Sequence, residues 1–395
     1  MSRKSILIIA TVLLILTAGV VLFYFLGGVP QPGERRGFFG TLPLVGREAP
    51  PAGPAPTAPP GALPPTAAER EKQVLLQVIE TDVLAPTLSA DGKSLYYVVR
   101  EDGHVKKTDL EGRNPETVSN LTVLETFEAL WSPKKTKLVM RYHDAGAVKT
   151  FVNELATGTP SRVLPQTVTA AAWSPDGAQL AYLARQGNTT NLVIADERLR
   201  SQRTALQTPI PDFILQWTSR NAILLVSKPS GLAPSLVERF DVGTRRLQNI
   251  FANLNGVTVL PVPDGSGFLF SATSDRGAPQ TLGIYKFSDG STRDLDITTL
   301  AEKCAFDSKT IKLFCAVPQG GFSGVMPDEW YRGAVSFSDV LVEIDLKTNA
   351  RKNLDLKGIN VDIVNLFISP DNQLLFFQDK KTGNVWRLAL EAERR

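Results

Sequence analysis

The chain has 395 residues, of which 43% are hydrophobic, and its formal net charge is +3. This length is sufficient for a sizeable core in one or two domains. The small charge, without any block of lysine or arginine, argues against a nucleic-acid-binding protein.

The first predicted element is a membrane anchor at residues 6–26, which carry no charge. At about 1.5 Å per residue, a helix of this length crosses a bilayer core of roughly 30 Å. The apolar run is long and lacks a small-residue cleavage site at its end, so we expect an uncleaved signal anchor. Arg3 and Lys4 lie in the short preceding end, residues 1–5. The positive-inside rule therefore favours a single-pass protein in the cell membrane, with a cytoplasmic N-terminus and an extracytoplasmic remainder.

Residues 27–69 are predicted to be a linker, because proline, glycine and alanine dominate them. Such a composition buries too little apolar surface to fold, and proline favours extended polyproline II structure. The simplest interpretation is a spacer between the membrane and the rest of the chain. A docking site for a domain that binds proline motifs is the alternative.

Residues 70–395 repeat a pattern of strand, tight turn and strand. The clearest copy is Trp173-Ser174-Pro175-Asp176-Gly177, which an apolar strand follows. Proline fixes φ in the turn, aspartate bonds its own backbone, and glycine permits positive φ at the exit. Aligned on the first residue of the turn, the copies begin at Ser89, Ser132, Ser174, Thr218, Val262, Asp307 and Ser369. Successive copies are 42 to 45 residues apart, except for the last interval of 62.

Each unit continues with a third strand and most with a short fourth one, which is the pattern of a β-propeller blade. The sequence therefore predicts an all-β, seven-bladed β-propeller over residues 70–395, preceded by one transmembrane helix and a proline-rich linker. The last unit has too few residues for a fourth strand. We expect residues 73–80 to supply it and so to close the ring. The alternative is a short helix over residues 69–80.

The turn sequence resembles the WD40-like repeat (PD40/TolB type) of the TolB propeller family. Trp173-Ser174-Pro175-Asp176-Gly177 and Ser369-Pro370-Asp371-Asn372 carry this resemblance. It implies a propeller fold and says almost nothing about function. TolB-type proteins carry a separate α/β domain and a cleaved signal, neither of which we expect here, so the resemblance does not imply a Tol–Pal role.

The long last interval places an insertion at residues 318–338, between the second and third strands of the sixth unit. Long loops on rigid scaffolds often carry function, and this one is rich in the residue types of interface hot spots. The candidate partner-binding residues are Phe322, Met326, Trp330, Tyr331 and Arg332. In the alternative interpretation, the loop folds back to plug the channel or to cover an exposed edge.

The two cysteines of the chain, Cys304 and Cys315, flank the turn of the sixth unit. The register in which Phe306 lies opposite Leu313 also places the two cysteines opposite each other. Directly opposed residues are close enough for a disulfide after local adjustment, which an extracytoplasmic location would permit. Otherwise the pair is two small buried hydrophobic residues.

Several kinds of chemistry leave no signature in the sequence. His104 and His143 lie in separate units, without Cys, His or Asp partners at metal-ligand spacing, so we predict no metal site. Neither a P-loop nor a Gly-x-Ser-x-Gly elbow is present, and we predict no catalytic residues and no cofactor. One recurring feature is an aspartate at the end of the third strand, which we expect to cap the next turn rather than to form a charged ring. These residues are Asp109, Asp196, Asp241 and Asp345.

The sequence thus favours a membrane-tethered, extracytoplasmic propeller that acts as a non-catalytic scaffold for a protein or an envelope polymer. The expected binding face is the one that bears residues 318–338. One alternative is an enzyme whose active site assembles at the channel mouth from several blades. The other is a structural subunit of an envelope assembly.

Overall fold

The computed structural model describes residues 74–155 and 159–390. The chain divides into two compact units, residues 1–64 and 65–395. The predicted membrane anchor and the predicted linker lie outside the described residues. Within the described ranges, no helix has both the length and the apolarity needed to cross a membrane.

The described part of the chain is nearly all β-structure, arranged in antiparallel sheets. Five sheets have four strands each. In chain order, the first three are β2 (Val83–Leu88), β3 (Ser94–Val99), β4 (Val105–Asp109) and β5 (Glu116–Ser119); β6 (Thr126–Trp131), β7 (Lys137–Asp144), β8 (Ala147–Glu154) and β9 (Thr159–Val163); and β10 (Val168–Trp173), β11 (Gln179–Gln186), β12 (Thr189–Asp196) and β13 (Gln202–Thr208). The last two are β21 (Cys304–Phe306), β22 (Lys312–Pro318), β23 (Asp339–Asp345) and β24 (Arg351–Leu354); and β25 (Ile363–Ile368), β26 (Leu374–Asp379), β27 (Val385–Ala389) and β1 (Leu75–Ile79).

A sixth sheet has seven strands and lies between the third and fourth of these in the sequence. It consists of β14 (Phe213–Ser219), β15 (Ala222–Ser227), β16 (Pro234–Asp241), β17 (Leu247–Pro261), β18 (Gly267–Thr273), β19 (Thr281–Lys286) and β20 (Thr292–Thr298). Its central strand, β17, is 15 residues long. The first part of β17 pairs with β16, and the part from Asn255 onward pairs with β18.

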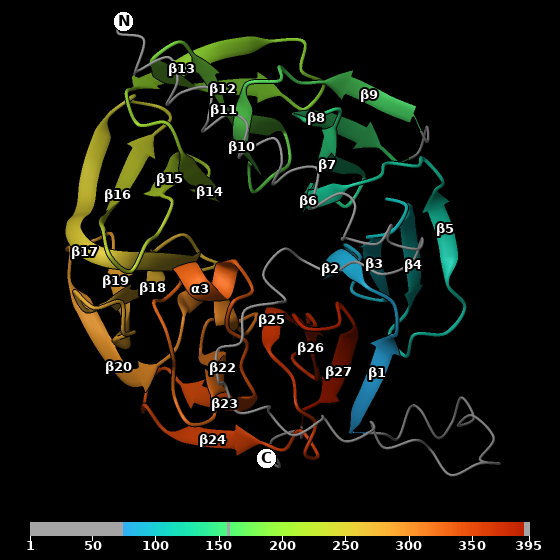
Figure 1. Cartoon of the computed structure of the whole chain (residues 1–395), viewed down its shortest axis with the longest axis vertical. Coiled ribbons are helices and arrows are strands. Elements are labelled where there is room, and N and C mark those ends of the chain that lie inside the picture. Colours follow the sequence, from blue (N-terminus) through green and yellow to red (C-terminus); the bar gives the residue numbers. More distant parts are fainter. Residues whose placement is uncertain (1–73, 156–158, 391–395) are drawn as a thin grey trace, which may run out of the picture. The chain divides into compact units, whose positions relative to one another are not determined.

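The sheets follow one another around a ring, with their first strands nearest the centre (Figure 1). Strand β1 comes from the beginning of the described chain and pairs with β27 at its end, so that Leu75 lies opposite Leu388. The pairing gives the last sheet its fourth strand and joins the two ends of the ring. Four-stranded antiparallel sheets arranged radially define a β-propeller, and this is the fold of the described residues.

The repeated turn sequence forms a tight hairpin turn because its polar side chains satisfy the turn's own backbone. In the copy at Ser174, the hydroxyl donates to the carboxylate of Asp176 at 2.6 Å and accepts the amide of Gln179 at 2.9 Å. Gly177 has a φ of 72°, a conformation that side chains other than glycine's disfavour. The turn is therefore a scaffold element that joins the first and second strands of a sheet.

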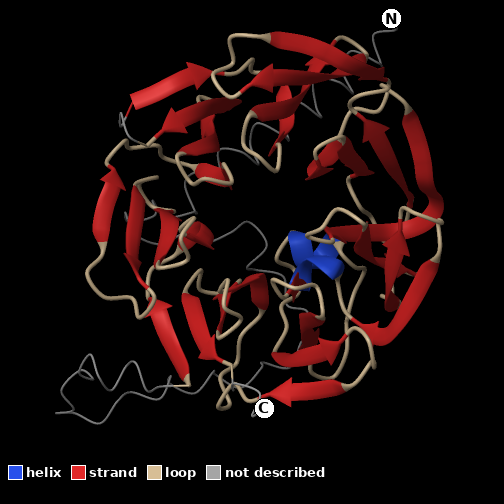
Figure 2. Cartoon of the chain, turned by 180° about the vertical axis from the view of Figure 1, so that it is seen from behind, coloured by secondary structure: helices blue, strands red, loops and turns tan. Residues whose placement is uncertain are grey.

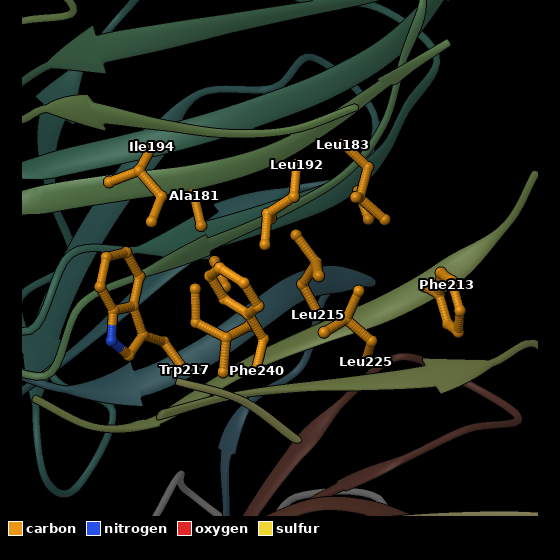
Figure 3. Packing of buried hydrophobic residues seen from close by; sticks show 12 residues of the cluster. Ala181, Leu183, Leu192, Ile194, Phe213, Leu215, Trp217, Leu225 and Phe240 are labelled. Carbon is orange, nitrogen blue, oxygen red and sulfur yellow. The ribbon is translucent and has the colours of Figure 1, made fainter. Parts of the chain in front are cut away.

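The core lies between neighbouring sheets. Figure 3 shows Ile194 and Leu192 of one sheet facing Trp217 and Phe240 of the next, in a cluster of twelve buried residues. The tryptophans before the turns also bridge sheets through hydrogen bonds. The Nε1 of Trp173 donates to the carbonyl oxygen of Leu130 at 3.2 Å, whereas the buried Nε1 of Trp217 has no partner.

The aspartates at the ends of the third strands cap the turns that follow them, as the sequence predicts. Asp196 accepts three backbone amides, from Arg198, Arg200 and Ser201, at 2.8 to 3.0 Å. Equivalent bonds form at Asp109, Asp241 and Asp345. Their role is local and structural.

Candidate functional site

The chain between β22 and β23 forms a packed insertion with one short helix, α3 (Asp328–Tyr331). In Figure 2 this helix, in blue, lies on the inner side of the ring near its centre. The five candidate residues have different surroundings. Met326 and Trp330 are buried, Phe322 is partly buried, and Tyr331 and Arg332 are exposed. The insertion therefore offers only part of its predicted hot-spot set to a partner.

Backbone contacts attach the insertion to loops of the seven-stranded sheet. The amide of Gly231, between β15 and β16, donates to Asp328 Oδ2 at 2.7 Å. The amide of Met326 donates to the carbonyl oxygen of Gly277, between β18 and β19, at 2.9 Å. Space is so tight that a Cβ on Gly231 would lie 2.2 Å from the carbonyl oxygen of Met326. We call the face of the propeller on which these loops lie the insertion face.

Beneath the insertion lies a fully buried ammonium group. Lys303 ends the 3₁₀ helix η1 (Ala301–Lys303), and neither its side chain nor its two acidic partners are accessible to solvent. Its Nζ lies 2.8 Å from Asp339 Oδ2 and 2.7 Å from Asp362 Oδ1. The rings of Trp330 and Phe337 cover the ammonium, with centroids 4.9 and 5.7 Å away. A buried charge is tolerated only with such pairing.

Asp362 connects this ion pair to the insertion. Its carboxylate accepts the indole Nε1 of Trp330 at 3.0 Å, the amide of Phe337 at 3.1 Å and the hydroxyl of Ser336 at 3.1 Å. Lys380 Nζ donates to the carbonyl oxygen of Trp330 at 2.8 Å. The insertion is thus bonded to the last sheet as well as to the seven-stranded one.

The two buried aspartates have opposite pKa shifts. Burial raises the pKa of Asp339 above its usual value, although the Lys303 ammonium opposes this effect. Burial also acts to raise the pKa of Asp362, but the Lys303 ammonium and the hydrogen bond from Trp330 outweigh it and leave that pKa lowered. Asp362 therefore favours the carboxylate form, and Asp339 is the carboxyl more readily protonated.

A second pair of polar side chains joins the insertion to η1. The hydroxyl of Tyr331 donates to Glu302 Oε1 at 2.6 Å. Burial raises the pKa of Glu302 to about 7, against the opposing effects of Tyr331, Lys303 and Lys380. Although Tyr331 is 37% exposed, the atoms packed around its hydroxyl desolvate that group, and this burial, followed by the charge of Glu302, raises the pKa of Tyr331 well above its ordinary value. A glutamate that titrates near neutral pH can act as a general acid or base.

The cysteines lie directly next to this network. Cys304 follows Lys303 in the chain and lies opposite Cys315 in the ladder between β21 and β22, and the two form a disulfide. Both side chains are buried within the core between sheets. The bond joins β21 to β22, and β22 is the strand that precedes the insertion.

The histidines occupy other sheets. His104 Nδ1 lies 3.0 Å from Asp102 Oδ2, and the ring of His143 packs on Phe127 with centroids 4.8 Å apart. Among the residues that the structure describes, no group of three or more His, Cys, Asp or Glu side chains is placed to hold a metal ion.

Sequence reasoning did not identify Glu302, Lys303, Asp339 and Asp362. They come from η1, from the first residue of β23 and from the connection between β24 and β25, and no spacing rule links them. A weak signal was present, because Lys303 and Asp362 interrupt otherwise apolar runs. A charged residue in such a run must be paired or neutral if the run is buried.

No protein-family model matches the chain, and no curated protein matches it significantly in sequence. Among solved structures, the chain is similar to oligogalacturonate lyase from Vibrio parahaemolyticus, with a TM-score of 0.57, 10% identity, and coverage of 82% of this chain and 92% of that one. It is also similar to an oligogalacturonate lyase in complex with manganese, with a TM-score of 0.56, 12% identity, and coverage of 80% and 90%. TolB from Acinetobacter baumannii aligns with a TM-score of 0.40 and 15% identity, over 77% of this chain and 65% of that one. At these identities the likeness to the lyases concerns the fold alone, and that fold is the propeller that the repeat predicts.

Proposed function

We propose that the protein is a non-catalytic scaffold that binds a partner protein on its insertion face. The observation that carries this proposal is the distribution of exposed apolar side chains. Of the eight large hydrophobic residues that are exposed in the described part of the chain, five belong to strand beginnings or loops of that face. They are Leu124, Phe127, Ile214, Leu232 and Tyr331.

These five residues come from three different sheets or from the loops next to them. Single exposed apolar residues are common on protein surfaces, but their concentration on one face favours an interaction surface. The packed insertion supports this role, because a rigid loop loses little conformational entropy on binding. Tyr331 and Arg332 are the predicted hot-spot residues that remain accessible there.

We also propose that the described part of the protein is a seven-bladed propeller. In this interpretation, the seven-stranded sheet is two blades, and β17 serves as the outer strand of one and the inner strand of the next. We further propose that residues 6–26 anchor the chain in the cell membrane, residues 27–69 form a spacer, and the propeller is extracytoplasmic. The disulfide between Cys304 and Cys315 supports an oxidising location.

The test is crosslinking and capture from the membrane fraction with the full chain. The variants Leu232→Asp and Tyr331→Ala change the insertion face, whereas Leu247→Ser removes an equally exposed residue at the opposite end of the sheets. We expect a protein that crosslinks to the wild type and to Leu247→Ser but is lost from both face variants. A capture pattern identical in all four chains would contradict the proposal. If the wild type captured an envelope polymer and no protein, the partner would be that polymer and the proposal of a protein partner would be wrong.

An enzyme is the second candidate, and Glu302 is the observation that favours it. Its pKa of about 7 and its hydrogen bond to Tyr331 are typical of an acid–base group. The similar folds named oligogalacturonate lyase suggest the first substrate to assay, with and without Mn²⁺. Cleavage by the wild type that is lost in Glu302→Gln would favour the enzyme over the scaffold.

A further inference from the structure

Lys303, Asp339 and Asp362 form a group that the proposed binding function does not use. All three side chains are fully buried, and two carboxylates compete for one ammonium. An ion pair in this environment loses the hydration of both charges, so conversion to a neutral amide removes a charge separation that the interior disfavours. The group also lies under two aromatic rings, which exclude water from it.

We propose that Lys303 and Asp339 condense with each other to form an intramolecular amide bond, with Asp362 as the base. The amine nitrogen lies 2.8 Å from Asp339 Oδ2, which is contact distance. Effective concentrations become very high when reacting groups are held at such a distance in a fixed orientation. The reaction needs neither an oxidant nor an activating nucleotide, since only water leaves.

The condensation forms one C–N bond and releases one water molecule. The ammonium first gives one proton to the Asp339 carboxylate, which leaves a neutral amine and a carboxylic acid. The nitrogen lone pair then attacks Cγ of Asp339, a C–N bond forms, and the carbonyl electrons move onto the oxygen. Asp362 takes a proton from the nitrogen and passes it to the Asp339 hydroxyl. The C–O bond breaks, one water molecule leaves, and the carbonyl re-forms as an amide.

Each participant has the contacts that its step requires. Asp339 Oδ2 lies 2.8 Å from the ammonium and takes its proton, so it becomes the hydroxyl that leaves as water, and the backbone amide of Ile363 holds it in place at 2.6 Å. Asp339 Oδ1 is buried without a hydrogen-bond partner and becomes the carbonyl oxygen of the amide, a neutral group that costs less in this position than a carboxylate oxygen. Asp362 Oδ1 lies 2.7 Å from the nitrogen whose proton it removes.

The opposite pKa shifts of the two aspartates support these roles. Attack by an amine requires a protonated carboxyl, and burial raises the pKa of Asp339. Removal of the proton requires a carboxylate, and the pKa of Asp362 is lowered. A pair of carboxyls whose environments separate their pKa values is typical of a divided acid and base role.

The same sheet contains a matched control. Lys312 Nζ lies 2.8 Å from Glu343 Oε1, the same distance as in the reactive pair, but these side chains are 26% and 18% exposed. Both side chains are partly exposed, so water reaches this pair. We expect the Lys312–Glu343 pair to remain an ordinary ion pair.

The experiment is peptide mapping by mass spectrometry of the full chain, purified in detergent, reduced and alkylated. We expect a branched peptide that joins Lys303 to Asp339 and whose mass is one water less than the sum of the two separate peptides. A protease that cleaves after lysine should fail to cleave after Lys303. The Lys312 and Glu343 peptides should remain separate. Wild-type protein that yields only separate Lys303 and Asp339 peptides would overturn the proposal. Crosslinking of both pairs would overturn it too, since it would indicate an artefact of preparation.

Two variants separate this chemistry from other crosslinks. Asp339→Asn can still be attacked at Cγ, with loss of ammonia instead of water, and so it should give a branched peptide of the same mass as the wild type. Lys303→Met should give none. A wild-type branched peptide that persists in Lys303→Met would contradict the assignment.

Discussion

The indole Nε1 of Trp330 donates a hydrogen bond to the carboxylate of Asp362 at 3.0 Å, across 32 residues of sequence. This bond joins the insertion to the connection that leads into the next sheet. Trp330 is therefore an anchor inside the molecule, although its residue type alone favoured a place in a partner interface. The candidate hot-spot residues consequently divide into those that fix the insertion and those that can contact a partner.

We predict that Trp330→Ala destabilises the protein by about 3 to 5 kcal/mol, the usual cost of replacing a buried tryptophan. The change also removes a hydrogen bond to Asp362 and the ring above Lys303. Urea denaturation measures the stability, and limited proteolysis should show cleavage within residues 318–338. Tyr331→Ala is the control, because its exposed ring should cost less than about 1 kcal/mol. Equal stability losses in the two variants would contradict the anchoring role.

The stability should fall as pH rises from about 4.5 to about 7, because the folded chain retains the proton of Glu302 that the unfolded chain has lost. Above about pH 7 the loss from this group is complete. We expect Glu302→Gln to reduce the change in the free energy of unfolding over this pH range by about 1 to 2 kcal/mol. This value includes a reduction for the solvent that reaches the carboxyl group. Denaturation curves at intervals from acid to neutral pH measure it. Parallel curves for wild type and variant would exclude Glu302 as the titrating group.

Reduction of the disulfide between Cys304 and Cys315 should cost about 2 to 3 kcal/mol, since the bond closes a short loop of 11 residues. Denaturation with and without reductant measures the difference. The double variant with alanine at both positions should be insensitive to reductant. Thiol alkylation of the native, unreduced protein should label neither cysteine.

Trp217→Phe and Trp173→Phe should differ, although both residues occupy the same place in the repeat. The Trp173 indole donates to the carbonyl oxygen of Leu130, whereas the Trp217 Nε1 is buried without a partner. Loss of the bond should cost about 1 kcal/mol at Trp173, and removal of the unpaired donor should be neutral or stabilising at Trp217. Thermal denaturation of both variants provides the comparison. A greater loss at Trp217 would contradict this explanation.

Deletion of residues 74–79 should expose the edge of β27, because β1 is its hydrogen-bonded neighbour. An unpaired edge strand promotes association between chains. We expect oligomers or aggregates in size-exclusion chromatography, together with lower stability. A monomer of wild-type stability would show that this pairing does not close the fold.

Local sequence determined much of this fold. The turn at Ser174 satisfies its own backbone, and the register that places Cys304 opposite Cys315 follows from counting along two strands. The orientation of the insertion could not be derived in this way. Whether Trp330 points inward depends on Asp362 and Lys380, which lie dozens of residues away and form no motif. The same applies to Glu302, whose pKa depends on burial beneath a loop that the sequence alone does not place.

Strand β17 belongs to two neighbouring parts of one continuous sheet, whereas β1 and β27 pair segments from the two ends of the described chain. The ring therefore differs in strength around its circumference. Partial opening should begin where β1 separates from β27, and the amides of β14 to β20 should exchange their hydrogens as one cooperative group. A force that pulls on the beginning of the described chain acts first on β1, so a tether attached there would load the weakest junction of the ring.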